Sequence, residues 1–527
     1  MRQLSGTDNL FLRLERGNQF MHVAGLGIYD PSTAPEGKVR FKDILRFFQS
    51  RLDALTVFRR RLVTVPFDLD RPYWIEDGDI DVEFHVRHIA LPYPGDWRQL
   101  CIQVARIHSR PLDRSKPLWE AYVIEGLNNI AGLPEGSFAL YVKLHHSAVD
   151  GEAGTEIIKA IHSMTAEDFS EPASGTRYRD REPSMVELYS RAVAHNMVKV
   201  PRLAKLSADT VARLAIAGAA VPGGLAEALK GAELPNVAKL VEALRKPPAT
   251  RFAGKVSSHR VVEVVGLPLA RFKAIRAHLP EATINDLFLT TVGGALRQYL
   301  ESKGELPEQT LTCMMPMSFR GADKTADVGN QIGMAVMPLH TELHDPIDRL
   351  QEIRRGAAKT KGMASLLGRD LAARLFDGLP DAAGELIARK VMLPQMSVVV
   401  SNVRGPDVPL FMAGARLVNY APVSIAIDGL GLNATGFSYN GTLWICVVAC
   451  RAMLPDPAFF AQCIRDSFDA LEQATMNAAA QQKNATDAAM HKEEHAPAKR
   501  RARSGRKAAR KSRSSARGRA AAAVTGE

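Results

Sequence analysis

Cysteine is scarce in this chain of 527 residues: there are five, Cys101, Cys313, Cys446, Cys450 and Cys463. Their number is odd and no two of them form a Cys-x-x-Cys pair, which excludes a disulfide framework and a zinc ribbon. We therefore expect a protein of a reducing compartment, the cytoplasm.

Long apolar runs are also missing. The first residues lack the apolar core of a secretory signal, and no segment reaches the ~18 apolar residues that a membrane span needs. The longest uncharged apolar run, residues 214–226, is interrupted by Pro222-Gly223-Gly224. With 527 residues, the chain is long enough to form two domains of about 200 residues each.

The serine motif of many hydrolases is absent as well. No Gly-x-Ser-x-Gly segment occurs, and Gly436-Phe437-Ser438-Tyr439-Asn440 comes closest but fails at its last position. The chain therefore offers no serine elbow to carry a covalent acyl intermediate.

What the sequence does contain is a pair of adjacent histidines followed by an aspartate and a glycine. The segment runs His145-His146-Ser147-Ala148-Val149-Asp150-Gly151. A histidine titrates near neutral pH, so its neutral ring can take a proton from an alcohol or amine. That group then becomes a nucleophile able to attack a thioester. The motif therefore indicates transfer of an acyl group.

The residues before the motif predict a β-strand. Residues of two kinds alternate there. The large apolar residues are Phe138, Leu140, Val142 and Leu144, and the residues between them are Ala139, Tyr141, Lys143 and His145. This period of two puts His146 on the apolar face and turns His145 the other way. We assign His146 as general base and His145 to supporting structure. Adjacent histidines on opposite faces do not bind one ion together, so no metal site is expected.

Asp150 and Gly151 follow the strand as a turn, with glycine suited to unusual backbone angles. The Asp150 carboxylate has two candidate roles. It orients the histidine as in a catalytic triad, or it locks the loop by pairing with a buried arginine. The turn favours the loop lock, and the run Arg59-Arg60-Arg61 supplies candidate partners.

The His-His-x-x-x-Asp-Gly pattern resembles that of the superfamily of chloramphenicol acetyltransferases, carnitine acyltransferases and peptide-synthetase condensation domains. Within it, the chain is similar to the bacterial wax ester synthase/diacylglycerol acyltransferase family. The resemblance covers roughly residues 1–475 and is carried in the same order by further segments. These are Leu4-Ser5-Gly6-Thr7-Asp8, Phe11-Leu12, Pro117-Leu118-Trp119-Glu120, Asn285-Asp286, Met315-Pro316-Met317-Ser318, Gly329-Asn330-Gln331, Ser401-Asn402-Val403-Arg404-Gly405-Pro406 and Asp428-Gly429-Leu430-Gly431-Leu432-Asn433.

The resemblance implies an α/β (α+β) fold of two chloramphenicol acetyltransferase-like domains, with mixed sheets flanked by helices and an active-site tunnel at their interface. It implies no cofactor, because acyl-CoA is a substrate. His146 would deprotonate a long-chain fatty alcohol or the hydroxyl of a diacylglycerol, which attacks the thioester directly. Asn285, Asn402 and the adjacent Ser401 are the implied residues for oxyanion stabilisation and substrate positioning. The alternative for Asn285 is helix capping, since Thr283-Ile284-Asn285-Asp286 suits a helix start.

The resemblance, together with composition, implies four regions. Residues 1–180 would form the acyltransferase domain with the motif, and 256–475 a second, similar domain. Between them, 181–255 reads as a helical linker in which 185–206 and 226–244 have amphipathic spacing. Such helices either bridge the domains or dock on a membrane and admit lipid.

Residues 476–527 are expected to form a disordered basic tail. From residue 490 onward twelve basic residues face three acidic ones, which accounts for +9 of the net charge of +11. The candidate partners are the anionic surface of the inner membrane or of lipid inclusions, nucleic acid bound through the tail alone, or no partner at all. We expect a cytoplasmic enzyme associated peripherally with such a lipid surface. Two alternatives stay open: a condensation-type transferase with a carrier-bound donor, and an inactive lipid-granule scaffold.

Overall fold

The computed structural model describes residues 1–52, 56–149, 151–167, 179–197, 247–318, 332–367 and 377–494. The chain divides into two units, Met1–Glu472 and Gln473–Glu527. The described part of the second unit is the end of helix α14 (Pro457–Glu494). All that follows on sheets, core and site concerns the first unit.

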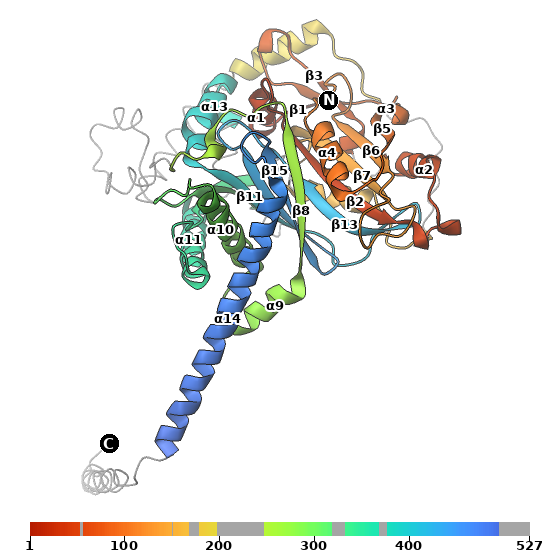
Figure 1. The fold of residues 1–527 in the computed structure, drawn as a ribbon. Coiled ribbons are helices and arrows are strands. Elements are labelled where there is room, and N and C mark those ends of the chain that lie inside the picture. The colour runs from red at the N-terminus through yellow and green to blue at the C-terminus, as the bar shows by residue number, and fades with distance from the viewer. Residues whose placement is uncertain are drawn as a thin grey trace, which may run out of the picture. The chain divides into compact units, whose positions relative to one another are not determined.

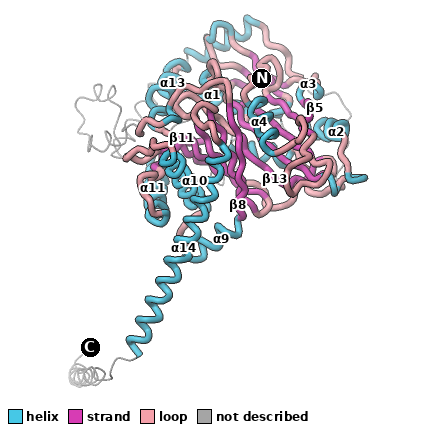
Figure 2. The backbone as a smooth tube through the Cα atoms, in the orientation of Figure 1, coloured by secondary structure: helices cyan, strands magenta, loops and turns pink. Residues whose placement is uncertain are grey.

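Two six-stranded sheets form the centre of the first unit, with helices around them (Figures 1 and 2). The first sheet has the order β12-β13-β2-β7-β6-β5, and only β5 and β6 run parallel in it. Its strands are β2 (His22–Asp30), β5 (Val86–Ala90), β6 (Trp119–Glu125), β7 (Phe138–His145), β12 (Phe411–Met412) and β13 (Ala415–Val423).

The second sheet has the order β10-β9-β11-β14-β15-β8. Here β11 runs parallel to both β9 and β14, and the other pairs are antiparallel. Its strands are β8 (Arg260–Pro268), β9 (Thr312–Ser318), β10 (Ile332–Pro338), β11 (Val398–Arg404), β14 (Leu432–Tyr439) and β15 (Thr442–Cys450). A small third sheet joins β1 (Arg2–Gln3), β4 (Tyr73–Glu76) and β3 (Arg60–Val63). The expected fold class, mixed α/β with flanking helices, is confirmed.

The helices of this unit begin where side chains can cap them. Ser5 caps α1, and Thr283 with Asp286 forms a capping box at the start of α10. The helices are α1 (Gly6–Leu14), α2 (Phe41–Arg51), α3 (Val82–His85), α4 (Trp97–His108), α5 (Gly151–Ala160), α9 (Leu269–His278), α10 (Ile284–Ser302), α11 (Pro346–Leu367) and α13 (Asp381–Ile387), together with the first residues of α14.

Helix α10 is almost wholly buried against the second sheet. Two adjacent glycines let the same helix lie close to the residue after β10 and to helix α14. A Cβ at Gly293 would lie 2.6 Å from the Leu339 carbonyl oxygen, and one at Gly294 would lie 2.1 Å from Ser467 Oγ. A further apolar cluster joins the two sheets, with Val262 of β8, Leu100 of α4 and Tyr141 of β7 among its members.

The sheets do not follow the expected split at residue 256. β12 and β13 come from the C-terminal half, yet β13 pairs with β2 from Arg416 opposite Asp30 to Val423 opposite Ala24. The N-terminal sheet is therefore completed by a hairpin about 400 residues along the chain. A division by sequence position does not detect such an exchange, because it depends on pairing between distant segments.

The regions around the sheets differ from expectation in one place. Helix α14 continues past residue 475, where the tail was expected to begin, to Glu494. Residues 495–527, the expected helix 226–244 and all of 198–206 lie outside the described residues. Of the expected amphipathic segment, residues 185–197 are helical. No helix in the described ranges is both long enough and apolar enough to cross a membrane.

Candidate active site

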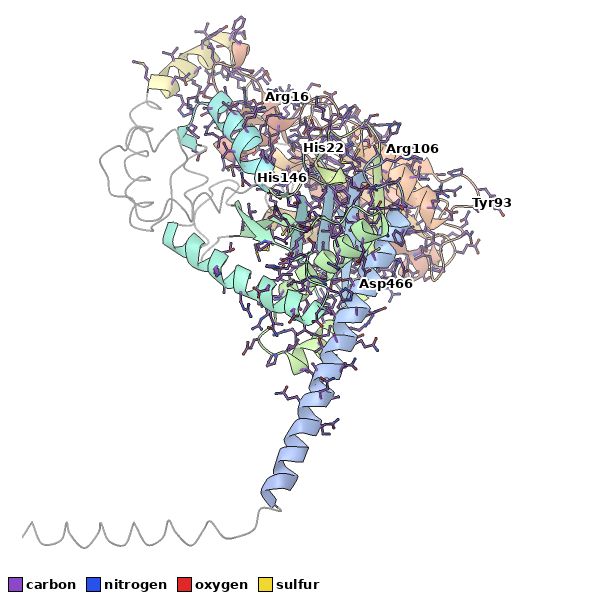
Figure 3. The ribbon with its side chains drawn as sticks, turned by 60° about the vertical axis from the view of Figure 1, so that its left-hand side comes forward. Arg16, His22, Tyr93, Arg106, His146 and Asp466 are labelled. Atoms are coloured by element: carbon purple, nitrogen blue, oxygen red, sulfur yellow. The ribbon has the colours of Figure 1, made fainter. Side chains whose placement is uncertain are left out.

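The histidine motif lies where β7 ends. His145 is the last residue of the strand, His146–Ala148 form a single 3-10 turn, and α5 begins at Gly151. Asp150 lies outside the described residues. All residues of the strand are buried, because each of its two faces packs in an apolar cluster and Lys143 pairs with Glu120 inside the protein. His146 itself is only partly buried (Figure 3).

His146 is held by its backbone and by its ring. Its N–H donates a hydrogen bond of 2.7 Å to the carbonyl of Met21. Its imidazole stacks on the ring of Phe11 in α1, with centroids 4.0 Å apart and planes inclined by 15°. Both contacts come from the first 21 residues of the chain, so the N-terminus sets the orientation of this ring.

His145 is completely enclosed. Its Nδ1 accepts a hydrogen bond of 3.0 Å from the Ser147 N–H and lies 2.6 Å from Ser147 Oγ. Its Nε2 lies 3.2 Å from Oε1 of Glu15. Burial lowers the pKa of His145 although Glu15 opposes that shift, so the ring is neutral at physiological pH.

Glu15 is the residue on which several of these contacts converge. Burial by itself would raise its pKa, but interactions with His145, Arg114 and the Met21 N–H lower it to about 2. The Arg114 guanidinium lies 2.5 Å from Oε2, and the Met21 N–H donates to Oε1 over 2.9 Å. His22 Nε2 is 3.4 Å from the same Oε1, and burial together with the charge of Lys143 keeps the pKa of His22 well below its ordinary value.

Asn285 and Asn402, far apart in the sequence, lie side by side. Asn402 Nδ2 donates a long hydrogen bond of 3.5 Å to Asn285 Oδ1, and Asn285 Nδ2 lies 3.6 Å from the sulfur of Met315. The helix cap is Thr283, so Asn285 is not required for capping. An amide nitrogen carries two hydrogens and a thioether is a weak acceptor, so Asn285 keeps donor capacity.

Ser401 takes a different position from its neighbour Asn402. Alternation along β11 puts Ser401 on the same face as Val399, opposite the face of Asn402. Val399 belongs to an apolar cluster with Leu10 and Leu14 of α1, against which Phe11 also packs. Phe11 therefore connects the His146 turn with the side of β11 that carries Ser401.

Arg60, of the run 59–61, reaches the motif. Arg60 Nη2 donates a hydrogen bond of 2.8 Å to the Ala148 carbonyl, and its guanidinium lies 4.8 Å from the Trp74 ring centre. Arg59 pairs with Glu76 and Arg61 with Asp77. Arg60 thus binds Ala148, the residue two positions before Asp150 in the sequence.

Sequence reasoning did not find Glu15 as part of the site. The available signal was weak, because Glu15 follows the end of α1 as its C-cap with an extended backbone. Among the described residues, no group of three or more histidine, cysteine, aspartate or glutamate side chains is arranged to hold a metal ion.

Comparisons with known proteins agree with this arrangement. Residues 4–288 match the wax ester synthase/diacylglycerol acyltransferase catalytic domain, and 328–472 match the C-terminal domain of the same family. The chain belongs to the wax ester synthase/diacylglycerol acyltransferase family. The O-acyltransferase WSD of Acinetobacter baylyi is 33% identical over 468 residues, which are 86% of this chain and 93% of that protein.

Solved structures show the same family and fold. The wax ester synthase/diacylglycerol acyltransferase of Marinobacter aquaeolei VT8 has a TM-score of 0.61 at 27% identity, covering 90% of this chain and 99% of that one. The starter condensation domain of rhizomide synthetase, at 13% identity, has a TM-score of 0.53 and covers 90% and 94%. The second likeness shows that this family shares the fold of condensation domains.

Proposed function

We propose that this family member is an acyl-CoA-dependent O-acyltransferase that esterifies a diacylglycerol, a long-chain fatty alcohol, or both. The observation that carries the proposal is the partly buried His146, whose backbone and ring are both held in place at the end of β7. A general base needs this combination of fixed orientation and access to substrate.

The reaction needs no covalent enzyme intermediate. His146 takes the proton of the acceptor hydroxyl while that oxygen forms a bond to the thioester carbonyl carbon. The carbon–sulfur bond of the tetrahedral intermediate then breaks, and the departing thiolate of CoA takes the proton back from His146. Asn285, with donor capacity left over, and its partner Asn402 stabilise the oxyanion. Ser401, on the other face of β11, positions substrate.

Asp150 and Gly151 complete the motif as a lock for the loop. The support is Arg60, which binds the carbonyl of Ala148, two positions before Asp150 in the sequence. Acyl-CoA is a substrate in this account, and no cofactor takes part.

Two experiments on the purified protein test the direct attack. Palmitoyl-CoA is first mixed with enzyme alone, and the protein mass and free CoA are measured; then hexadecanol or dipalmitoylglycerol is added. We expect CoA release and ester only after the acceptor is present, with the protein mass unchanged throughout. An acylated protein, or stoichiometric CoA release without acceptor, would contradict the mechanism. Activity with a carrier-bound donor but not with palmitoyl-CoA would favour the condensation-type alternative.

We also infer that the enzyme works at a lipid surface, because both acceptors are insoluble in water. Helix 185–197 buries Leu188 and Ala192 but exposes Val186, Val193 and Met197 on its outer side, to 78%, 59% and 74%. Phe67, 87% exposed, lies in the neighbouring loop, which Asn196 holds through the Leu69 carbonyl over 2.8 Å.

Flotation with phosphatidylglycerol-containing vesicles tests this inference. The double variant Phe67→Ser/Met197→Ser should bind vesicles more weakly than the parent, whereas Tyr93→Ser, which alters another fully exposed aromatic, should bind like the parent. Equal vesicle binding by the parent, the double variant and Tyr93→Ser would show that this apolar surface does not contribute to lipid binding. The scaffold alternative would be favoured by vesicle or DNA binding in a folded protein without turnover.

A further inference from the structure

We propose that Phe11 and Glu15, one helical turn apart at the end of α1, are positioning residues that fix His146 for proton transfer. The inference rests on the proposed function of His146 and adds to it the residues that orient the base. Three separate connections run from these two side chains to the 146–148 turn, and each restrains a different part of it.

The first connection is direct. Phe11 covers one face of the His146 imidazole at a centroid distance of 4.0 Å. Phe11 is itself held, because its neighbours Leu10, Leu12 and Leu14 are buried and α1 is anchored along its length. The imidazole cannot tilt without displacing a packed aromatic ring, so the stacked contact restrains the plane of the ring.

The second connection passes through Met21. Glu15 Oε1 accepts the Met21 N–H over 2.9 Å, and the Met21 carbonyl in turn accepts the His146 N–H over 2.7 Å. Glu15 therefore holds the residue whose carbonyl, in the next peptide group, binds the backbone of His146. A charged acceptor makes the stronger kind of hydrogen bond, which suits a rigid connection.

The third connection passes through His145. Its Nδ1 accepts the Ser147 N–H, so the proton of this neutral ring must be on Nε2. That edge faces Glu15 Oε1 at 3.2 Å. The negative charge of Glu15 favours this tautomer, which places the N–H beside the carboxylate and leaves Nδ1 to cap the 3-10 turn that begins at His146. Arg114 secures Glu15 from the other side.

The test compares kinetic constants of single variants, with palmitoyl-CoA and hexadecanol as substrates. Glu15→Gln keeps the shape of the side chain and removes its charge, and Phe11→Leu removes the flat ring. Both should lower kcat by about 10²-fold and leave KM for palmitoyl-CoA unchanged, because a misplaced base costs rate and not binding. Phe11→Tyr keeps the stacked ring and should recover the parent kcat.

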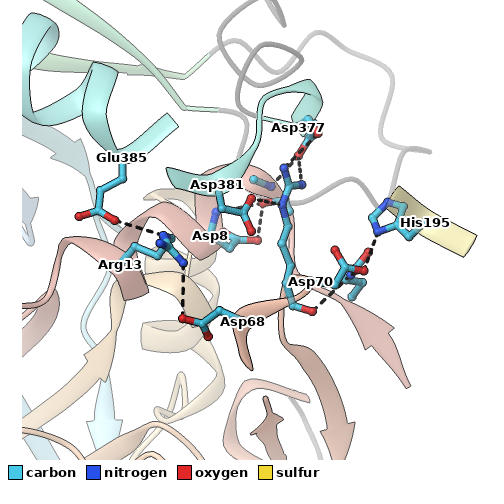
Figure 4. Close-up of polar contacts among 12 residues, drawn as sticks. Asp8, Arg13, Asp68, Asp70, His195, Asp377, Asp381 and Glu385 are labelled. Carbon is cyan, nitrogen blue, oxygen red and sulfur yellow. Dashed lines mark hydrogen bonds and ion pairs between the residues drawn. The ribbon is translucent and has the colours of Figure 1, made fainter. Parts of the chain in front are cut away.

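Glu385→Gln is the matched control. Glu385 is a buried carboxylate that binds Arg13 of α1 at 3.2 Å (Figure 4) and also pairs with Arg16, just after the helix. Its loss weakens the attachment of α1 without touching Glu15 or Phe11. If Glu385→Gln lowers kcat as much as Glu15→Gln, the effect is general anchoring of α1 and the proposal is overturned.

A readout besides activity is the NMR signal of the His146 ring protons in protein labelled at histidine, assigned by its loss in His146→Ala. The stacked Phe11 ring should shift this signal upfield in the parent and in Phe11→Tyr, but not in Phe11→Leu, and Glu15→Gln should displace it. Unmoved signals in Glu15→Gln would overturn the positioning role. Full turnover by His146→Ala would instead refute the proposed function, and the NMR result would still decide whether Glu15 positions this ring.

Discussion

At the scale of single residues, neighbours in the sequence have very different surroundings. His145 is enclosed and neutral between Ser147 and Glu15, whereas His146 is partly open and stacked on Phe11. Asn285 and Asn402 show the reverse, since 117 residues separate them and one hydrogen bond joins them. Position in the fold, more than position in the sequence, therefore decides what surrounds each of these side chains.

Asn285→Ala should lower kcat by roughly 10²–10³-fold, the usual cost of losing one oxyanion donor. KM should change little, because the donor acts on charge that forms only in the transition state. Thr283→Ala, which removes the true cap of the same helix, is the control: it should cost about 1 kcal/mol of stability and leave kcat unchanged. Steady-state kinetics and thermal melts of both variants measure this. Equal loss of kcat in the two would assign the effect to the helix start.

At the scale of elements, local patterns predicted much of the structure. Alternation over residues 138–145 predicted β7, and the capping sequence predicted the start of α10 at Thr283. Contacts such as Glu15 with His145 were not predictable, because a carboxylate at the end of an amphipathic helix reads as solvent-exposed until its partners are known. Ser401 and Asn402 were both predicted to be site residues. In the structure they are adjacent in β11, so their side chains lie on opposite faces of the strand.

The Glu15 carboxylate should make stability depend on acid pH. Its pKa is lowered from 4.5 to about 2 in the folded protein, so the stabilisation it gives is complete above about pH 4.5 and is lost as the pH falls towards 2. That shift corresponds to a contribution of the order of 3 kcal/mol. Urea unfolding of the parent and of Glu15→Gln between pH 6 and 3 should give midpoints that converge as the pH falls. A constant gap between them would contradict the lowered pKa.

The contact of β13 with β2 should be sensitive to the size of residue 25. A Cβ at Gly25 would lie 2.0 Å from the Tyr420 hydroxyl, so Gly25→Val must displace that ring and should cost about 1–3 kcal/mol. Gly356→Ala in α11 is the control, because the nearest atom to its new Cβ is 3.9 Å away and alanine favours a helix. Thermal melts should show a lower midpoint for the first variant and an unchanged or higher one for the second. A midpoint for Gly25→Val equal to that of the parent would contradict the packing.

At the scale of the whole molecule, the two halves share the first sheet, since β12 and β13 of the C-terminal half complete it. Nothing in the sequence pattern distinguishes β13 from a strand of the second sheet, because pairing partners over this separation are set by the folded chain. The family resemblance predicted the fold class, whereas only the structure shows that β12 and β13 belong to the first sheet.

Most of the net positive charge lies beyond residue 489, so deletion of residues 495–527 should act on partners and not on chemistry. We expect unchanged turnover with detergent-dispersed substrates and weaker binding to phosphatidylglycerol vesicles, since each basic residue near such a surface contributes about 1 kcal/mol. Replacing the basic residues of this segment by glutamine should have the same effect. If the deletion abolishes turnover with dispersed substrates, the tail belongs to the catalytic unit.

The central claim is that His146 is the general base of acyl transfer and His145 its support. One turnover assay tests it most directly: parent, His146→Ala and His145→Ala with palmitoyl-CoA, each offered hexadecanol and dipalmitoylglycerol in parallel. We expect ester from the parent, almost none from His146→Ala with either acceptor, and more from His145→Ala than from His146→Ala. Equal residual activity in the two variants, or no ester from the folded parent, would contradict it.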